Sequence, residues 1–86
     1  MTTTYTWIVK HLNSDMRGYA NIGFFEMQAV DENEKTATTS VSVCFGGDEL
    51  KPMPQWTQEA IDAYAETQRS GLEKELTARL DALEQA

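Results

Sequence analysis

The chain has 86 residues, of which 41 % are hydrophobic and 24 % are charged, as in an ordinary globular domain. Fourteen acidic residues against seven basic ones give a formal net charge of −7. This balance argues against direct binding to nucleic acids or anionic membranes, because both are bound through clustered Lys and Arg. No apolar run approaches the ~18 residues of a membrane span, and no signal peptide is evident. We therefore expect one soluble domain over residues 1–86, made in the cytosol, whose partner is basic if charge steers binding.

The first predicted strand covers residues 3–12, which include the segment "TYTWIVKHL". The side chains of a strand point alternately to its two faces. Simple alternation gives one face with Tyr5, Trp7, Val9 and His11 and another with Thr6, Ile8, Lys10 and Leu12. The following "NSDMRG" is rich in turn-forming residues and predicts a hairpin loop.

The second predicted strand, residues 19–30, is apolar on both faces, and such a strand belongs in the centre of a sheet. One of its faces carries Ile22 and Phe24, and the other carries Phe25 and Met27. "DENEK" then predicts a solvated turn. The third predicted strand, residues 36–45, alternates cleanly. Its inward residues are Ala37, Val41, Val43 and Phe45, and its outward residues are Thr38, Ser40 and Ser42.

A helix is predicted for residues 57–85. Thr57 is a good N-cap, and apolar residues recur at steps of three and four: Ile61, Tyr64, Ala65, Leu72, Leu76, Leu80 and Leu83, with Gln68 on the same stripe. Ser70 and Gly71 mark a place where the helix could bend or divide, and we favour one bent helix. The fold class is therefore α+β, a three-stranded antiparallel β-meander (1–47), a loop (48–56) and a C-terminal helix (57–85) in the order β-β-β-α.

No group of residues predicts catalysis, a metal site or a cofactor site. His11 is the only histidine and has no second histidine or cysteine near it in sequence, so we expect a structural or surface role. Cys44 is the only cysteine, which excludes an internal disulfide, and it lacks the basic neighbour that activates a thiol. We expect Cys44 to be a small residue that is buried or half-buried, and the protein not to be an enzyme.

Two surfaces are candidates for binding a protein partner. One helix covers only one face of a sheet, so some of the large residues of the first two strands should lie on the other face, available to a partner or to a second copy: Tyr5, Trp7, Phe24, Phe25 or Met27. The residues of this candidate interface are Tyr5, Trp7, Phe25 and Met27. The second candidate is an acidic face of the helix formed by Glu59, Asp62, Glu66 and Glu73, for which the alternative is a simple solvated face.

The N-terminal "TYTW" resembles the start of a loosely defined set of small tailed-bacteriophage proteins of unknown function. Such proteins continue with two strands that end near glycine and close with a helical segment, a plan that "ANIGFFEMQAV" and "WTQEAIDAY" follow here. The resemblance spans nearly the whole chain. It implies a phage origin, with the protein in the virion or in the cytoplasm of the infected bacterium, and it transfers no functional residue.

Two hypotheses follow from these features. The first is a protein–protein interaction module of a tailed phage, a small virion or assembly component that docks on itself or on a larger protein. The alternative is an acidic inhibitor that blocks a basic surface of a host nuclease or other defence protein, motivated by the net charge and the acidic helix residues.

Overall fold

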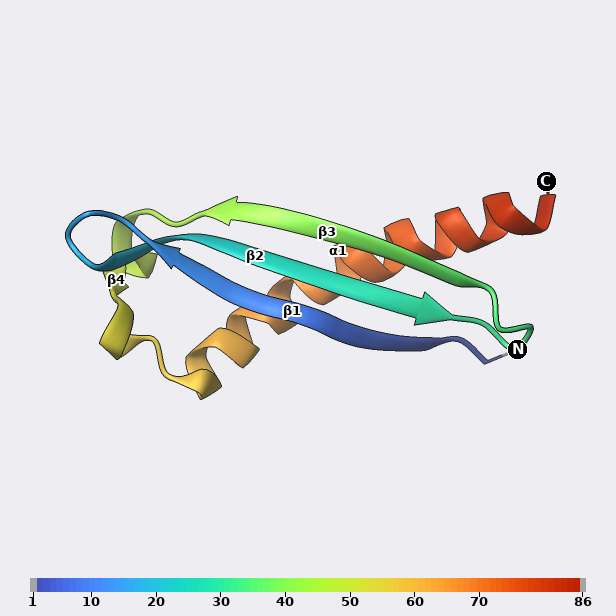
Figure 1. Ribbon diagram of the computed structural model, residues 1–86, viewed down its shortest axis with the longest axis horizontal. Coiled ribbons are helices and arrows are strands. Elements are labelled where there is room, and N and C mark those ends of the chain that lie inside the picture. Colours follow the sequence, from blue (N-terminus) through green and yellow to red (C-terminus); the bar gives the residue numbers. More distant parts are fainter. Residues whose placement is uncertain (1, 86) are drawn as a thin grey trace.

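Three long strands and one long helix account for most of the chain, and the computed structural model describes residues 2–85. The elements are β1 (Thr4–Ser14), β2 (Tyr19–Val30), β3 (Thr36–Cys44) and α1 (Gln58–Gln85) (Figure 1). The strands form an antiparallel sheet in the order β1-β2-β3, and α1 lies across one face of it. The predicted α+β class and the order β-β-β-α are confirmed.

The two strand pairs differ in regularity. The register of β2 with β3 is continuous from Ile22 opposite Cys44 to Val30 opposite Thr36. The register of β1 with β2 shifts between Trp7 and Val9 and again between Asn13 and Ser14. An extra residue in one strand moves every later side chain to the opposite face of the sheet.

The first of these shifts corrects the predicted faces of β1. After the extra residue Ile8, Val9 lies opposite Glu26 and His11 opposite Phe24, which puts both on the sheet face away from the helix. Lys10 and Leu12 lie toward the helix instead, and Leu12 is buried there. The predicted grouping of Val9 and His11 with Trp7 is therefore wrong.

Both hairpin loops are held by an aspartate. The Asp15 carboxylate accepts hydrogen bonds from the backbone N–H groups of Arg17 and Tyr19, at 2.8 and 3.1 Å. In the "DENEK" turn the Asp31 carboxylate accepts from the N–H groups of Asn33 and Lys35, at 2.9 and 2.8 Å. A short acidic side chain at the start of a turn satisfies backbone donors that the turn would otherwise leave unpaired.

The segment predicted as a loop, residues 48–56, contains regular structure. Two 3₁₀ turns, Gly47–Glu49 and Met53–Gln55, flank a two-residue strand β4 (Lys51–Pro52). β4 pairs with the start of β2, opposite Tyr19 and Ala20, beside the first hairpin. Two prolines do not prevent this pairing, because proline is tolerated in a short edge strand.

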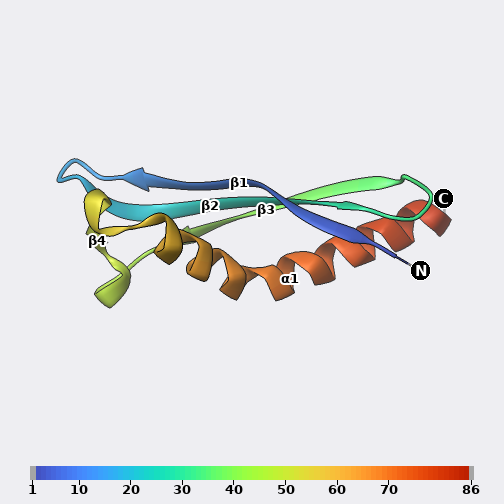
Figure 2. The ribbon, with the colours of Figure 1, turned by 90° about the horizontal axis from the view of Figure 1, so that it is seen from below.

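Helix α1 begins as predicted, with Thr57 as its N-cap. The Thr57 hydroxyl oxygen accepts a hydrogen bond from the backbone N–H of Ala60 at 3.2 Å. The helix is continuous through Ser70 and Gly71, and it curves gently, bowed away from the sheet (Figure 2). The predicted apolar stripe is largely buried, but Leu83 is 46 % exposed and is not a core residue.

The core between sheet and helix has two parts. The first contains Leu12, Ala20, Phe25, Phe45, Trp56 and Ala65, with Val43, Ile61 and Tyr64 packed against it. The second contains Met27, Ala29, Ala37, Leu72, Leu76 and Leu80. Trp7 and Val41 pack against both parts and join them.

The molecule is long and thin, with extents of 47 × 21 × 16 Å and a radius of gyration of 15.1 Å. A compact chain of this length would have a radius of gyration of about 12 Å. The difference reflects the long hairpins and the two-layer build. Only one face of the sheet has a layer packed on it in the described structure (Figure 2).

Candidate functional site

The four residues predicted to line an uncovered sheet face lie on the face that α1 covers. Phe25 and Met27 are fully buried, and the ring of Trp7 meets Phe25 edge-on at a centroid distance of 6.3 Å. The hydroxyl groups of Tyr5 and Thr77 form a hydrogen bond of 2.9 Å between β1 and α1. The expectation that Tyr5, Trp7, Phe25 or Met27 is exposed on the far side is wrong, because all four side chains lie on the face of the sheet that the helix covers.

The sheet face away from α1, here called the open face, carries a different apolar group. It consists of residues from β1 and β2 that lie near the first hairpin, and we call it the outer patch: Ile8, Val9, Ile22 and Phe24. Ile8 is 48 % exposed and Ile22 is 36 % exposed, whereas Val9 and Phe24 are half-buried. The extra residue in β1 creates this patch, because it lets Ile8 and Val9 share one face.

The rest of the open face is polar. Toward the second hairpin its residues are Thr4, Thr6, Glu26, Gln28, Thr38 and Ser40. Near the outer patch lie His11 and Ser42, opposite Phe24, and Asn13 and Cys44, opposite Ile22. The open face therefore has a polar half toward the second hairpin and a half toward the first hairpin in which the outer patch is bordered by polar side chains.

His11 and Cys44 are both at the surface. The His11 Nε2 and Asn13 Oδ1 atoms are hydrogen-bonded at 3.0 Å, an exposed contact consistent with the expected surface role. Cys44 is a free, exposed thiol, so the expectation of a buried or half-buried cysteine is wrong. Its outward position follows from its parity with Ser40 and Ser42 on the regular strand β3.

The acidic helix residues are mostly paired with cations. Lys10 Nζ lies 2.7 Å from Asp62 Oδ1, and Arg69 contacts both Glu66, at 3.5 Å, and Glu73, at 2.5 Å. Glu59 lies in the exposed first turn of α1. The Lys10 contact exists because the shift in β1 turns that lysine toward the helix. The predicted acidic face is thus interrupted by two positive charges.

We expect the pKa of Asp62 to depend on Lys10. The hydrogen bond from Lys10, followed by that from Gln58, holds the pKa of the Asp62 carboxyl below its ordinary value. Because this pKa is lower in the folded chain than in the unfolded one, the pair stabilises the fold at neutral pH, and that contribution is lost as the pH falls through the folded pKa. Lys10→Met should raise the Asp62 pKa in an NMR titration.

The exposed Lys74 offers a control for this titration. Lys74→Met removes a lysine from α1 that makes no ion pair with Asp62. It should leave the Asp62 pKa where it is in the unmodified chain. Equal shifts from the two lysine substitutions would mean that net charge, and not the Lys10 contact, sets this pKa.

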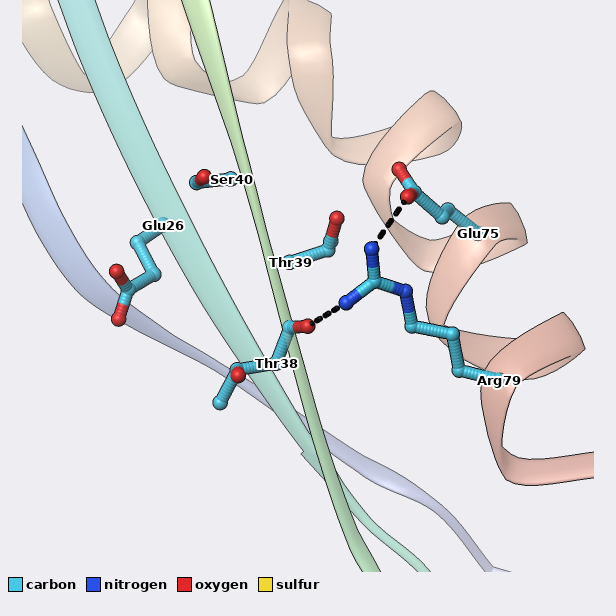
Figure 3. Close-up of a pocket in the computed structure, with 6 residues that line it drawn as sticks. All are labelled: Glu26, Thr38, Thr39, Ser40, Glu75 and Arg79. Carbon is cyan, nitrogen blue, oxygen red and sulfur yellow. Dashed lines mark hydrogen bonds and ion pairs between the residues drawn. The ribbon is translucent and has the colours of Figure 1, made fainter. Parts of the chain in front are cut away.

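Two shallow hollows lie along the outer edge of β3, between this strand and α1. The first, about 270 Å³, is lined by Glu26, Thr38, Thr39, Ser40, Glu75 and Arg79 (Figure 3). In it, Arg79 donates hydrogen bonds to the backbone carbonyl of Thr38 and to the Glu75 carboxylate. The second, about 150 Å³, is lined by Ser40, Val41, Gln68, Gly71, Leu72 and Glu75.

A third hollow, of about 440 Å³, lies at the start of α1. Its lining combines aromatic rings with charges: Asp48, Glu49, Lys51, Trp56, Ala60, Ala63, Tyr64 and Thr67. Lys51 Nζ is 5.0 Å from the centre of the Trp56 ring. Burial, and then the negative charge of Glu49, raises the pKa of Tyr64. Trp56 belongs to the first part of the core, and Tyr64 packs against it.

The described part of the chain holds no cluster of three or more His, Cys, Asp or Glu side chains placed to bind a metal ion. None of its helices is long and apolar enough to cross a membrane. Sequence reasoning placed Phe24 among the residues that could lie on an uncovered face, and it missed the other members of the outer patch, Ile8, Val9 and Ile22. The spacing of Trp7 and Leu12 is the available signal for these. These two apolar residues are an odd number of positions apart, yet both belong to the core side of one strand.

In comparisons with known proteins, no family model, no curated protein and no solved structure matches this chain.

Proposed function

We propose that the chain is a non-enzymatic protein–protein interaction module of a tailed phage, a small component of the virion or of its assembly. The observation that carries this proposal is the outer patch, where Ile8 and Ile22 are exposed beside Phe24 on a sheet face without a covering layer. Apolar side chains grouped on one exposed face are typical of contact surfaces. The phage origin rests on the resemblance of "TYTW" and the segments that follow it.

The composition of the open face supports a contact at one place. An antiparallel sheet with one solvated face normally carries polar residues on that face. The half nearer the second hairpin follows this rule, whereas Ile22 and Phe24 occupy consecutive outward positions of the central strand β2. Complete burial of one such side chain is worth about 1.5–3 kcal/mol, so a partner that covers the outer patch gains substantial binding energy.

The alternative, an acidic inhibitor of a host nuclease or defence protein, has less support. A basic partner would need free carboxylates on α1, and Lys10 and Arg69 already contact Asp62, Glu66 and Glu73. The net charge of −7 is common to many small proteins and selects no partner by itself.

The proposal is tested by affinity capture from phage-infected cells with the tagged chain and two charge variants. Ile22→Asp places one negative charge in the outer patch, and Thr6→Asp places the same charge in the polar half of the open face. We expect the unmodified chain and Thr6→Asp to recover the same phage virion or assembly protein, and Ile22→Asp to lose it. Circular dichroism checks that both variants are folded.

Two results would count against this proposal. Equal recovery with Ile22→Asp and Thr6→Asp would exclude the outer patch as the contact. Recovery of a host nuclease or defence protein that is lost on Glu66→Lys, and kept on Ile22→Asp, would favour the acidic inhibitor instead.

A further inference from the structure

The outer edge of β3 carries backbone groups that no other strand of residues 2–85 pairs with. The N–H of Phe45 donates to the carbonyl of Asn21 at 2.8 Å, which makes these two residues a hydrogen-bonded pair. Such pairs alternate along an antiparallel ladder, so the odd-numbered residues of β3 bond to β2. The outward-pointing backbone groups are those of Thr38, Ser40, Ser42 and Cys44.

One end of this edge is already closed. Arg79 bonds to the Thr38 carbonyl, and the last turns of α1 extend past the edge of the sheet at this end (Figures 1 and 3). Beyond Thr38 no other strand of residues 2–85 pairs with the edge, and the α1 side chains nearest to it line open hollows beside Ser40 and Val41. Figure 1 shows β3 as the border of the sheet there. The available stretch of backbone runs over residues 40–44.

The edge of β3 also lacks the features that protect exposed strands from pairing. Proteins interrupt such edges with charged residues, prolines or bulges. β3 (TATTSVSVC) has no charged residue, no proline and no shift in its register. The opposite edge strand, β1, contains the extra residue Ile8, which interrupts its regular pairing, and an inward-pointing Lys10. The contrast indicates that β1 is protected and β3 is left able to pair.

The side chains beside this edge are incompletely covered. Val41 and Val43 point toward the helix side, yet both are only half-buried. The hollow of about 150 Å³ between β3 and α1 reaches Val41 and Leu72 from the same side. A further strand added at the edge would cover both valines.

We propose that β3 pairs antiparallel with β3 of a second copy of the chain, about a two-fold axis at Ser42, so that the two sheets become one. In this register each Ser42 lies opposite the other, Ser40 lies opposite the second copy's Cys44, and Val41 lies opposite the second copy's Val43. The outward-pointing backbone groups at residues 40–44 then bond to one another. A two-fold contact of this kind is self-complementary and closed.

Two observations favour a second copy as the partner of β3 and Ser42 as the position of the two-fold axis. Each copy carries a net charge of −7, so most self-contacts would oppose like charges, whereas β3 contributes no charge to the seam. An axis at Ser40 would place Val41 opposite Thr39 and would need the Thr38 carbonyl that Arg79 already holds. The axis at Ser42 does not need the Thr38 carbonyl, and it places Val41 and Val43 of one copy opposite Val43 and Val41 of the other. This contact goes beyond the proposed function, since it involves neither the outer patch nor a phage partner.

The first test is the mass of the purified chain by light scattering over a concentration series. We expect a dimer, at twice the chain mass of 9.7 kDa. Ser42→Pro should weaken the dimer by about tenfold or more, which is about 1.4 kcal/mol. The lost N–H points out of the sheet, so the pairing of β3 with β2 is retained. Ser42→Thr, which keeps the N–H, should remain dimeric.

The second test is cross-linking, which does not depend on the proline variant being folded. Hydrogen-bonded opposite residues have Cα atoms about 5.5 Å apart, within the range of a disulfide. Ser42→Cys in a Cys44→Ser background should therefore form a disulfide dimer with oxidised glutathione, which accepts the two electrons. Ser40→Cys in the same background should cross-link far less, because its opposite residue is then a serine.

Three results would overturn the proposal. A monomer at every concentration excludes the contact, while leaving capture through the outer patch unaffected. A dimer that Ser42→Pro, once shown to be folded, leaves as stable as Ser42→Thr does would use another surface. Equal cross-linking of Ser42→Cys and Ser40→Cys would exclude the axis at Ser42.

Discussion

Replacing Phe25 with alanine should lower the free energy of unfolding by about 3–5 kcal/mol, the usual cost of removing a buried phenylalanine. Phe25 is fully buried on the central strand, with Trp7 against it edge-on and Tyr64 stacked on it at a centroid distance of 5.8 Å. Its loss leaves a cavity that these neighbours cannot fill without leaving their own contacts. Chemical denaturation followed by circular dichroism measures the change.

Phe24 provides the matched control for this measurement. It is the adjacent residue on the same strand, but it lies in the outer patch and is only half-buried. Phe24→Ala should cost clearly less than Phe25→Ala, because Phe24 is only partly buried and no second layer packs on its face of the sheet. Similar losses of unfolding free energy for the two substitutions would mean that α1 does not cover the Phe25 face of β2 in preference to the Phe24 face.

The strands and their order could be predicted because their pattern is local. β3 alternates without interruption, so the burial of Ala37 and the exposure of Thr38 and Ser40 follow from the sequence. The cap at Thr57 is also local, since a hydroxyl three residues before a free N–H is enough to form it. Features of this kind need no information from the rest of the fold.

The faces of β1 could not be predicted in this way. Ile8 is an extra residue opposite β2, and nothing in "TYTWIVKHL" requires it locally. The shift is favoured by tertiary packing, because it buries Leu12 in the first part of the core and brings Lys10 within 2.7 Å of Asp62. One displaced residue therefore changes both candidate surfaces: it forms the outer patch and neutralises part of the acidic helix face.

The choice between the two apolar faces of β2 also depends on the fold. Phe24 and Phe25 are both large and apolar, so neither residue marks the core face by itself. A partial signal is present in the residues that share each parity, because Glu26 and Gln28 have the parity of Phe24, whereas Gly23, Met27 and Ala29 have that of Phe25.

Phe45→Ala should likewise cost about 3–5 kcal/mol, and its effect should depend on Gly23. Phe45 is 7 % exposed and stacks on Trp56 at a centroid distance of 5.0 Å. A Cβ atom placed on Gly23 would lie 2.8 Å from the Phe45 ring and 2.9 Å from the Phe25 ring. Gly23 is thus the space into which both rings fit, and Gly23→Ala should itself cost about 1–3 kcal/mol through overpacking.

A double-mutant cycle tests this dependence. In the Phe45→Ala background one of the two clashes is gone, so the cost of Gly23→Ala should fall by at least about 0.5 kcal/mol, the size of coupling expected for residues in contact. Gly71→Ala is the control, because the space around this helix glycine is open. It should stabilise the chain by about 0.5–1 kcal/mol in either background. If Gly23→Ala costs the same with and without the Phe45 ring, the close fit between them does not exist in solution.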